Sequence, residues 1–119
     1  VETIKEIAEE EGIRAGTFTA MGAIKRGKLG YYNQDTHEYQ QIEVDEPCEI
    51  ASCMGNISIL DDEPFVHAHA VLTDESGKAM GGHLSETEVF AAEIHIQVLE
   101  GPKLERVPDE ITDLTLWDL

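Results

Sequence analysis

Apolar side chains recur along this chain in two rhythms, a helical one at the start and an alternating one almost everywhere else. In residues 2–11 they stand three and four positions apart, the spacing that puts them on one face of a helix. Gly12 follows directly and is a natural helix end. We therefore expect a helix over residues 2–11. Its apolar stripe consists of Val1, Ile4, Ile7 and Ala8.

From residue 13 onward, stretches rich in β-branched and aromatic residues are separated by turn-forming residues. This pattern predicts six or seven β-strands. The expected strands are residues 13–24, 27–33, 38–44, 48–60, 65–73, 78–84 and 88–99, joined by turns at 34–37, 61–64 and 74–77 and by a loop at 85–87. His37 is expected to be a solvated residue of its turn. Gly22, inside the first strand, indicates a bend or a close approach of another stretch of chain.

Two of these strands have clearly different faces. In residues 88–99, alternation puts apolar side chains on a face that we expect to join the core, and puts Glu93 and His95 on the other face. In residues 65–73, the face opposite the apolar one carries His67 and His69. The expected core residues are Phe90, Ala92, Ile94, Ile96 and Val98 in the first case and Val66, Ala68, Ala70 and Leu72 in the second.

One helix followed by many strands with short connections predicts an α+β fold. The length suits a single domain, residues 1–119, built around a mostly antiparallel sheet. Residues 101–119, with two prolines and the only tryptophan, are expected to be irregular and to pack their apolar side chains on the sheet. No run of 18 apolar residues is present, so we expect no membrane-spanning segment.

The charge of the chain is strongly one-sided. Twenty-five acidic residues face eight Lys and Arg, for a formal net charge of −17. Affinity for DNA phosphates comes from basic groups that displace counterions, so direct nucleic-acid binding is disfavoured. The sequence also lacks a Gly-rich phosphate-binding loop and a Gly-x-Ser-x-Gly nucleophile motif.

The two cysteines indicate a reducing compartment. Cys48 and Cys53 lack the Cys-x-x-Cys spacing of redox and zinc motifs. Their odd separation on one strand predicts that they lie on opposite faces, so we expect no internal disulfide and a location in the cytoplasm.

Three histidines are the strongest candidates for chemistry. His67 and His69 share one face of an extended segment, and His83 follows the pair Gly81 and Gly82 on the expected return strand. Three imidazoles around an open position suit zinc best, and also iron, nickel or copper. The plainer alternative is that they are half-buried strand residues. Because only neutral imidazoles bind a metal, we expect a bound ion to be lost as the pH falls through about 6.

The sequence leaves two functional classes open. One is a binding module whose metal belongs to its fold. The other is a metal-dependent enzyme of the zinc hydrolase type, in which Glu93 would be the candidate general base for a metal-bound water. A cupin-like enzyme is a variant of the second class, but its acidic ligand would fall near Asp74 or Glu75, within a turn.

Four stretches together resemble a known family. They are GIRAGTFTAMGAIKRGKLGYY, CEIASCMGNISI, PFVHAHAVLTDESGKAMGGHL and VFAAEIHIQVLEG. In order and spacing they are similar to the plants-and-prokaryotes-conserved (PPC) domain over roughly residues 4–116, most specifically in His-x-His followed by Gly-Gly-His-Leu. The resemblance implies a curved antiparallel sheet, assembly as a homotrimer, and self-association and partner binding by the domain. Stand-alone prokaryotic members are often labelled as DNA-binding proteins.

The chain departs from that family in two respects. It has no AT-hook, the basic motif that binds DNA in the plant members. Family members usually carry a strand before the first helix, so we expect a short leading segment to be missing here. The three histidines fit the stand-alone prokaryotic pattern better than the plant one. The resemblance therefore favours a metal-binding, self-associating module with a protein or small-molecule partner over a DNA-binding domain.

Overall fold

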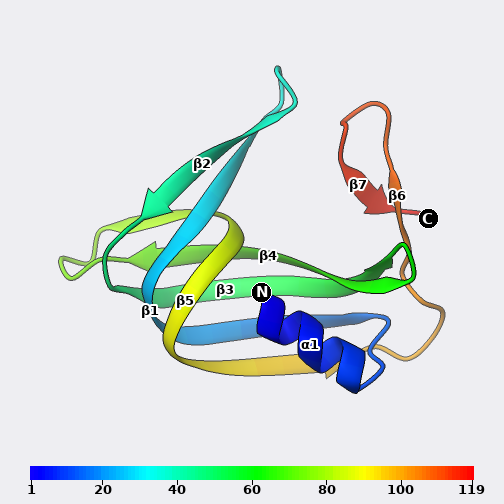
Figure 1. Cartoon of the computed structure of the whole chain (residues 1–119), viewed down its shortest axis with the longest axis horizontal. Coiled ribbons are helices and arrows are strands. Elements are labelled where there is room, and N and C mark those ends of the chain that lie inside the picture. The colour runs from blue at the N-terminus through cyan, green and yellow to red at the C-terminus, as the bar shows by residue number, and fades with distance from the viewer.

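The computed structural model describes residues 1–119 as one helix and seven strands (Figure 1). The elements are α1 (Glu2–Glu10), β1 (Gly16–Asn33), β2 (Glu38–Val44), β3 (Cys48–Leu60), β4 (Glu63–Thr73), β5 (Ala79–Val98), β6 (Arg106–Pro108) and β7 (Thr115–Trp117). The predicted helix is confirmed. It ends where Gly12 adopts a φ of 65° and Ile13 N–H donates to the Ala8 carbonyl.

The two longest strands are each longer than predicted. β1 joins the stretches expected at 13–24 and 27–33, and β5 joins those expected at 78–84 and 88–99. The loop predicted at 85–87 is therefore wrong. The register of β1 against β5 shifts between Ala23 and Ile24 and again between Gly27 and Leu29. Such bulges bend a strand while its neighbours stay hydrogen-bonded, so turn-forming residues need not end it.

All pairings of the main sheet are antiparallel, which confirms the α+β class. The strand order is β2-β1-β3-β4-β5. β5 also pairs with β1 along most of its length, so the sheet curls until its fifth strand reaches its second (Figure 1). The beginning of β5 pairs with β4, and only its later part lies far from β4.

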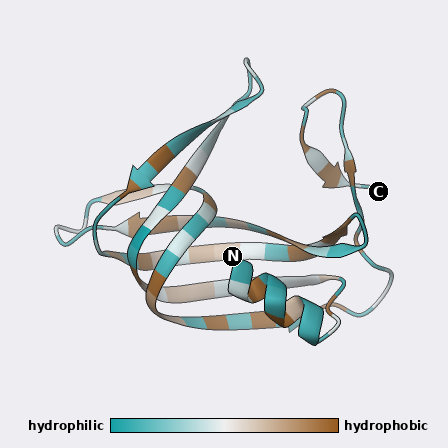
Figure 2. Ribbon diagram, in the orientation of Figure 1, coloured by the Kyte–Doolittle hydropathy of each residue, from teal (hydrophilic) through white to brown (hydrophobic).

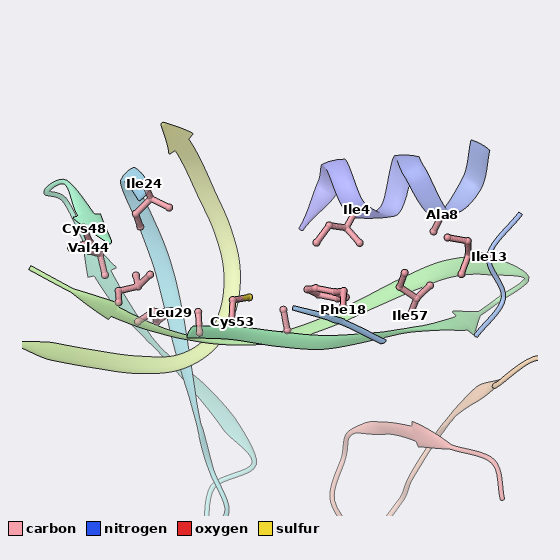
Figure 3. Packing of buried hydrophobic residues seen from close by; sticks show 13 residues of the cluster. Ile4, Ala8, Ile13, Phe18, Ile24, Leu29, Val44, Cys48, Cys53 and Ile57 are labelled. Atoms are coloured by element: carbon pink, nitrogen blue, oxygen red, sulfur yellow. The ribbon is translucent and has the colours of Figure 1, made fainter. Parts of the chain in front are cut away.

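Part of the core lies between the sheet and α1, and the rest, with Ile24, Leu29, Val44 and Cys48, lies away from the helix among the curled strands (Figure 3). Ile4 and Ala8 of the helix point toward Phe18 and Ile57 of the sheet (Figure 3). Ala68, Ala70 and Leu72 of β4 are buried in the same cluster, as the alternation predicted. The β1–β2 tip and the C-terminal segment extend on the side opposite α1 (Figure 3).

The C-terminal segment is more regular than expected. β6 and β7 form a small antiparallel hairpin that pairs Arg106 with Trp117. Ile59 N–H donates to the Leu104 carbonyl, which attaches the segment to β3. The prediction of an irregular tail over 101–119 was therefore wrong for these strands, because each is only three residues long and leaves little periodic signal.

Local turn chemistry was a reliable guide. The turn after β4 contains Gly77 with a φ of 80°, and the Asp74 carboxylate accepts hydrogen bonds from Ser76 and Lys78. Between β3 and β4, Asp61 and Asp62 both have positive φ, which is typical of a two-residue hairpin turn. β4 consequently begins at Glu63.

The two cysteines lie on the same face of β3, which corrects the prediction. Both Cys48 and Cys53 are buried in the core cluster. A shift in the β3–β4 register between Ile50 and Ser52 inserts one residue and restores an even spacing between them. They remain free thiols, and burial raises the pKa of both.

The predicted core face of β5 is mostly exposed. Phe90 is 74% exposed, Val98 55% and Ile94 39%. Only Ile96 of that set packs partly against the core. Apolar bands recur along β5 (Figure 2), but α1 is too short to cover them. Within a single chain, the alternating apolar side chains of β5 therefore form a stripe that is mostly exposed.

α1 is the only helix, and its nine residues are too few and too polar to cross a membrane.

Candidate metal centre

Two of the candidate ligands come from β4. His67 and His69 project from the face opposite Ala68 and Ala70, which are buried on the α1 side. Their ring centroids are 5.1 Å apart. The simple alternation of a strand therefore brings the pair together, as the sequence predicted.

The third ligand comes from β5. His83 is the direct cross-strand partner of His69. The hairpin between β4 and β5 sets this register. The two glycines before His83 permit it, since a Cβ on Gly82 would lie 2.6 Å from the Gly30 carbonyl oxygen and one on Gly81 2.9 Å from the Ala70 carbonyl oxygen. Both glycines therefore let neighbouring backbone approach closely.

The three imidazoles converge on one point. The centroid of His83 lies 5.1 Å from that of His67 and 5.7 Å from that of His69. One ligand nitrogen from each ring lies within 4.8 Å of the others. In a tetrahedral zinc site with bonds of about 2.0–2.1 Å, ligand nitrogens are about 3.3 Å apart. Small rotations of the side chains close this difference.

The bonding state of His83 also fits a metal ligand. Its Nδ1 atom is buried and has no hydrogen-bond partner in the chain. A buried polar atom without a partner is costly and uncommon in folded proteins. A cation bound at the centre of the three rings would give an imidazole nitrogen a partner that the protein itself does not supply.

The environment keeps two of the rings neutral. Burial, with the nearby His83, Arg106 and His69, lowers the pKa of His67 to about 4. Burial and the neighbouring His69 lower the pKa of His83. For these two ligands, proton competition with a metal begins at a lower pH than for a free imidazole.

The lowered pKa of His67 predicts an acid-sensitive fold in the metal-free protein. Between pH 6.5 and about 4 the unfolded chain binds a proton at His67 and the folded chain does not, so stability falls as the pH falls through this window. The ring is only partly buried, and solvent screens part of the effect. We expect a loss of about 1–2 kcal/mol in the free energy of unfolding, measured by urea denaturation with a chelator present.

The control separates this effect from carboxylate titration. A His67→Gln variant keeps the carboxylates and should lose less stability between pH 7 and pH 4.5 than the unmodified chain. His95→Gln, at an exposed position of β5, should behave like the unmodified chain. Equal losses in all three proteins would show that His67 is not held neutral by the fold.

The structure does not bring Glu93 and His95 to the three histidines within one chain. His95 pairs with Thr19 of β1, which pairs with Met54 of β3, which pairs with His69. Three steps between neighbouring strands amount to roughly 14 Å. Glu93 comes two residues before His95 on β5 and pairs with Met21 of β1. Glu93 could act beside the histidines only if this part of β5 neighboured β4, and within one chain β1 and β3 lie between them.

Sequence reasoning missed two residues beside the histidines. The ring of Tyr39 on β2 packs against His83, with centroids 5.3 Å apart. Arg106 of β6 donates a hydrogen bond to Asn56, which is the cross-strand partner of His67. Neither contact has a local signal, because both join segments far apart in the chain.

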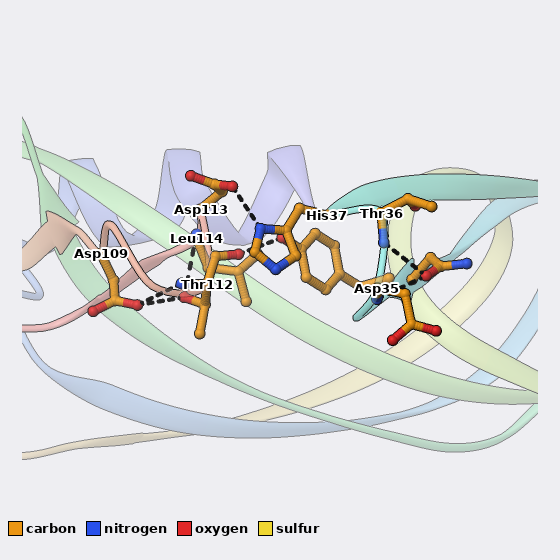
Figure 4. Close-up of polar contacts among 9 residues, drawn as sticks. Asp35, Thr36, His37, Asp109, Thr112, Asp113 and Leu114 are labelled. Atoms are coloured by element: carbon orange, nitrogen blue, oxygen red, sulfur yellow. Dashed lines mark hydrogen bonds and ion pairs between the residues drawn. The ribbon is translucent and has the colours of Figure 1, made fainter.

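The β1–β2 tip touches the loop between β6 and β7 (Figure 4). His37 Nδ1 lies 2.6 Å from the Asp113 carboxylate, and the Tyr32 hydroxyl donates to the Thr112 carbonyl. The Asp109 carboxylate accepts two hydrogen bonds from Thr112 and shapes that loop. His37 is therefore an exposed residue of its turn, as predicted, and in addition it connects the turn to the β6–β7 loop.

Comparison with known proteins points to one family. Residues 1–100 match the Plants and Prokaryotes Conserved (PCC) domain. None of the curated proteins shows a significant match to the chain.

Several solved structures are similar to this chain. The metal-containing protein AF0104 of Archaeoglobus fulgidus is 44% identical, with a TM-score of 0.96 over 100% of this chain and 84% of that one. A plant- and prokaryote-conserved (PPC) protein of Pyrococcus horikoshii is 42% identical, with a TM-score of 0.94 over 99% of this chain and 82% of that one. A third structure is a protein of Ralstonia eutropha JMP134 that is described as a putative DNA-binding protein. It is 24% identical, with a TM-score of 0.90 over 99% of this chain and 82% of that one. At this identity the similarity shows the fold alone.

Proposed function

The chain belongs to the Plants and Prokaryotes Conserved (PCC) domain family, and from that premise we propose that it is a metal-binding module that assembles from copies of itself. The observation that carries the proposal is the convergence of His67, His69 and His83 on one point, with ligand nitrogens within 4.8 Å of one another. The description of the A. fulgidus relative as a metal-containing protein supports it.

Zinc is the metal that we propose. Three neutral imidazole nitrogens with a fourth position open to solvent are a common zinc ligand set. When bound, the ion would serve as a Lewis acid and as a link between β4 and β5. His67 and His69 would hold it from β4 and His83 from β5. Within one chain, Glu93 lies about three strand spacings from these rings, which supports a binding role over hydrolysis.

The assembly that we propose is a homotrimer. Its support is the apolar stripe of β5, in which Phe90 and Val98 are more than half exposed, together with the resemblance that the sequence shows to trimeric proteins. Met21 on the neighbouring β1 is also largely exposed. Apolar patches of this kind mark interaction surfaces, and copies of the same chain are the proposed occupants.

Two measurements on the purified protein test this function together. Elemental analysis should find one zinc ion per chain, and the mass in solution should be that of three 13.2 kDa chains, about 40 kDa. Phe90→Glu should shift the mass toward that of one chain, because a charge in an apolar interface is costly. Ile111→Glu, at an exposed site on the C-terminal loop, is the matched control and should remain trimeric. A monomer with no metal would contradict the proposal.

We expect no direct DNA binding by this module. Five of its eight basic side chains already pair with carboxylates, and the net charge is −17. These are Lys5, Lys25, Arg26, Lys28 and Lys103. In a band-shift assay with duplex DNA at physiological salt, micromolar protein should leave the DNA free. A salt-sensitive shift at that concentration would overturn this expectation.

We propose that the partner is a protein or a small molecule and that the module binds it in the cytoplasm. The absence of a disulfide between the free thiols of Cys48 and Cys53 supports a reducing environment.

A further inference from the structure

The candidate metal centre contains no negatively charged side chain: the groups close enough to share a cation are His67, His69 and His83 alone. The charged side chain beside it is a cation, Arg106, which donates a hydrogen bond to Asn56, the cross-strand partner of His67. This is unexpected in a chain with 25 acidic residues, and it means that the protein supplies no counter-charge for a cation bound here.

Arg106 is held without being neutralised. Its Nε–H donates to Ser58 Oγ at 2.7 Å, one Nη1–H to the Thr115 carbonyl at 2.8 Å and one Nη2–H to Asn56 Oδ1 at 3.0 Å. All three acceptors are neutral. A guanidinium has five N–H groups, so one on each terminal nitrogen is left for a ligand. The Phe65 ring, 4.9 Å from its central carbon, further restrains the group.

The guanidinium lies next to the candidate metal centre. Asn56 and Ser58 are the cross-strand partners of His67 and Phe65. Directly paired residues project from the same face with Cβ atoms about 4.5–5.5 Å apart. The group that Arg106 Nη2 contacts is therefore the immediate neighbour of a metal ligand.

A divalent ion held by three neutral imidazoles keeps its full charge, and Arg106 adds a second cation beside it. With no carboxylate between them, the two repel each other in a partly desolvated site. We propose that this centre binds its metal together with a small oxyanion, a carboxylate ligand, that takes the fourth coordination position and interacts with Arg106. This inference rests on the proposed metal-binding function and names the class of molecule that the site accepts.

Cobalt(II) provides a direct test, because its visible spectrum reports the ligands of the ion. Protein freed of metal is loaded with one cobalt ion per chain in chloride-free buffer and titrated with sodium acetate and, separately, with methylphosphonate. Acetate should change the spectrum in a saturable manner. In Arg106→Gln its apparent affinity should be about tenfold lower, while cobalt stoichiometry stays the same. Stronger binding of methylphosphonate than of acetate would overturn the assignment to carboxylates.

A second variant separates the charge of Arg106 from its structural role. Asn56→Asp keeps an acceptor for Arg106 Nη2 and so keeps the β6–β7 hairpin attached, but it neutralises the guanidinium. It should weaken acetate binding and strengthen cobalt binding without anion. Arg14→Gln, at an exposed site, is the matched control and should resemble the unmodified chain. Emission from Trp117, the only tryptophan, checks that the hairpin is still in place.

The outcomes are distinguishable. If cobalt binds and acetate leaves its spectrum unchanged, the inference fails and the metal-binding function stands. If acetate binds equally well to the unmodified chain and to Asn56→Asp, Arg106 does not take part and the inference fails. If no cobalt binds, the proposed function and the inference fail together.

Discussion

A His69→Ala variant should lose its metal almost completely. The residue supplies one of three ligands, and replacing even a group that only supports a metal ligand typically lowers affinity by about 10–100-fold. Loss of the ligand itself should cost at least about a hundredfold. Because the His69 side chain is exposed, the substitution should leave the fold intact. Elemental analysis after gel filtration should fall from one ion per chain to nearly none.

Two further variants make this prediction specific. His83→Ala should have the same effect on metal content, because His83 is the cross-strand partner of His69. His95→Ala removes an exposed histidine of β5, the strand that carries His83, and should retain full metal content. Full retention in His69→Ala would refute the ligand assignment, and loss in His95→Ala would point to a site elsewhere.

A Gly22→Ala variant should be strongly destabilised, although the substitution adds only one methyl group. Gly22 has a φ of 145°, and a Cβ there would lie 2.2 Å from the Ala91 carbonyl oxygen and 2.7 Å from Ala92 Cα. Both are backbone atoms of β5 and cannot rotate away. Strain of this kind, added to the unfavourable φ, should lower the free energy of unfolding by about 3 kcal/mol or more. Urea denaturation monitored by circular dichroism measures the change.

Gly101 offers a closely matched control. It has a similar φ, 134°, but a Cβ there would have no neighbour within 4 Å. Gly101→Ala should therefore cost only the backbone term, about 1 kcal/mol. Similar losses in the two variants would show that β1 and β5 do not approach each other as closely at Gly22 as the structure has them.

The proposed centre would need no loop devoted to the metal. All three candidate ligands lie on two adjacent strands joined by a tight turn, and the inner faces of those strands pack in or against the core. The site is therefore as rigid as the sheet. The second cation, Arg106, comes from the C-terminal hairpin, which lies outside the part that matches the family. The side chain that we propose for binding the anion therefore lies in a different segment from the side chains that we propose for binding the metal.

Some of these features follow from local sequence alone. The helical period of residues 2–11 and the glycine after it predicted α1 nearly to the residue. The alternation around Ala68 and Ala70 predicted that His67 and His69 share a face away from the core. The turn residues before Lys78 predicted the hairpin that returns to His83. Each of these depends on contacts within a few residues, and such contacts leave a readable pattern.

Other features depend on how distant strands align, and only the tertiary structure decided them. A bulge in β3 put Cys48 and Cys53 on one face, against the parity of their spacing. The curl of the sheet paired the later part of β5 with β1, which left Phe90 exposed and kept Glu93 away from the histidines. Folding of the chain brought Arg106 to Asn56, which is 50 positions away in the sequence. A pattern of alternation states which residues share a face of their own strand; it carries no information on which strand lies beside it, because register and bulges are set by the packing of the whole sheet.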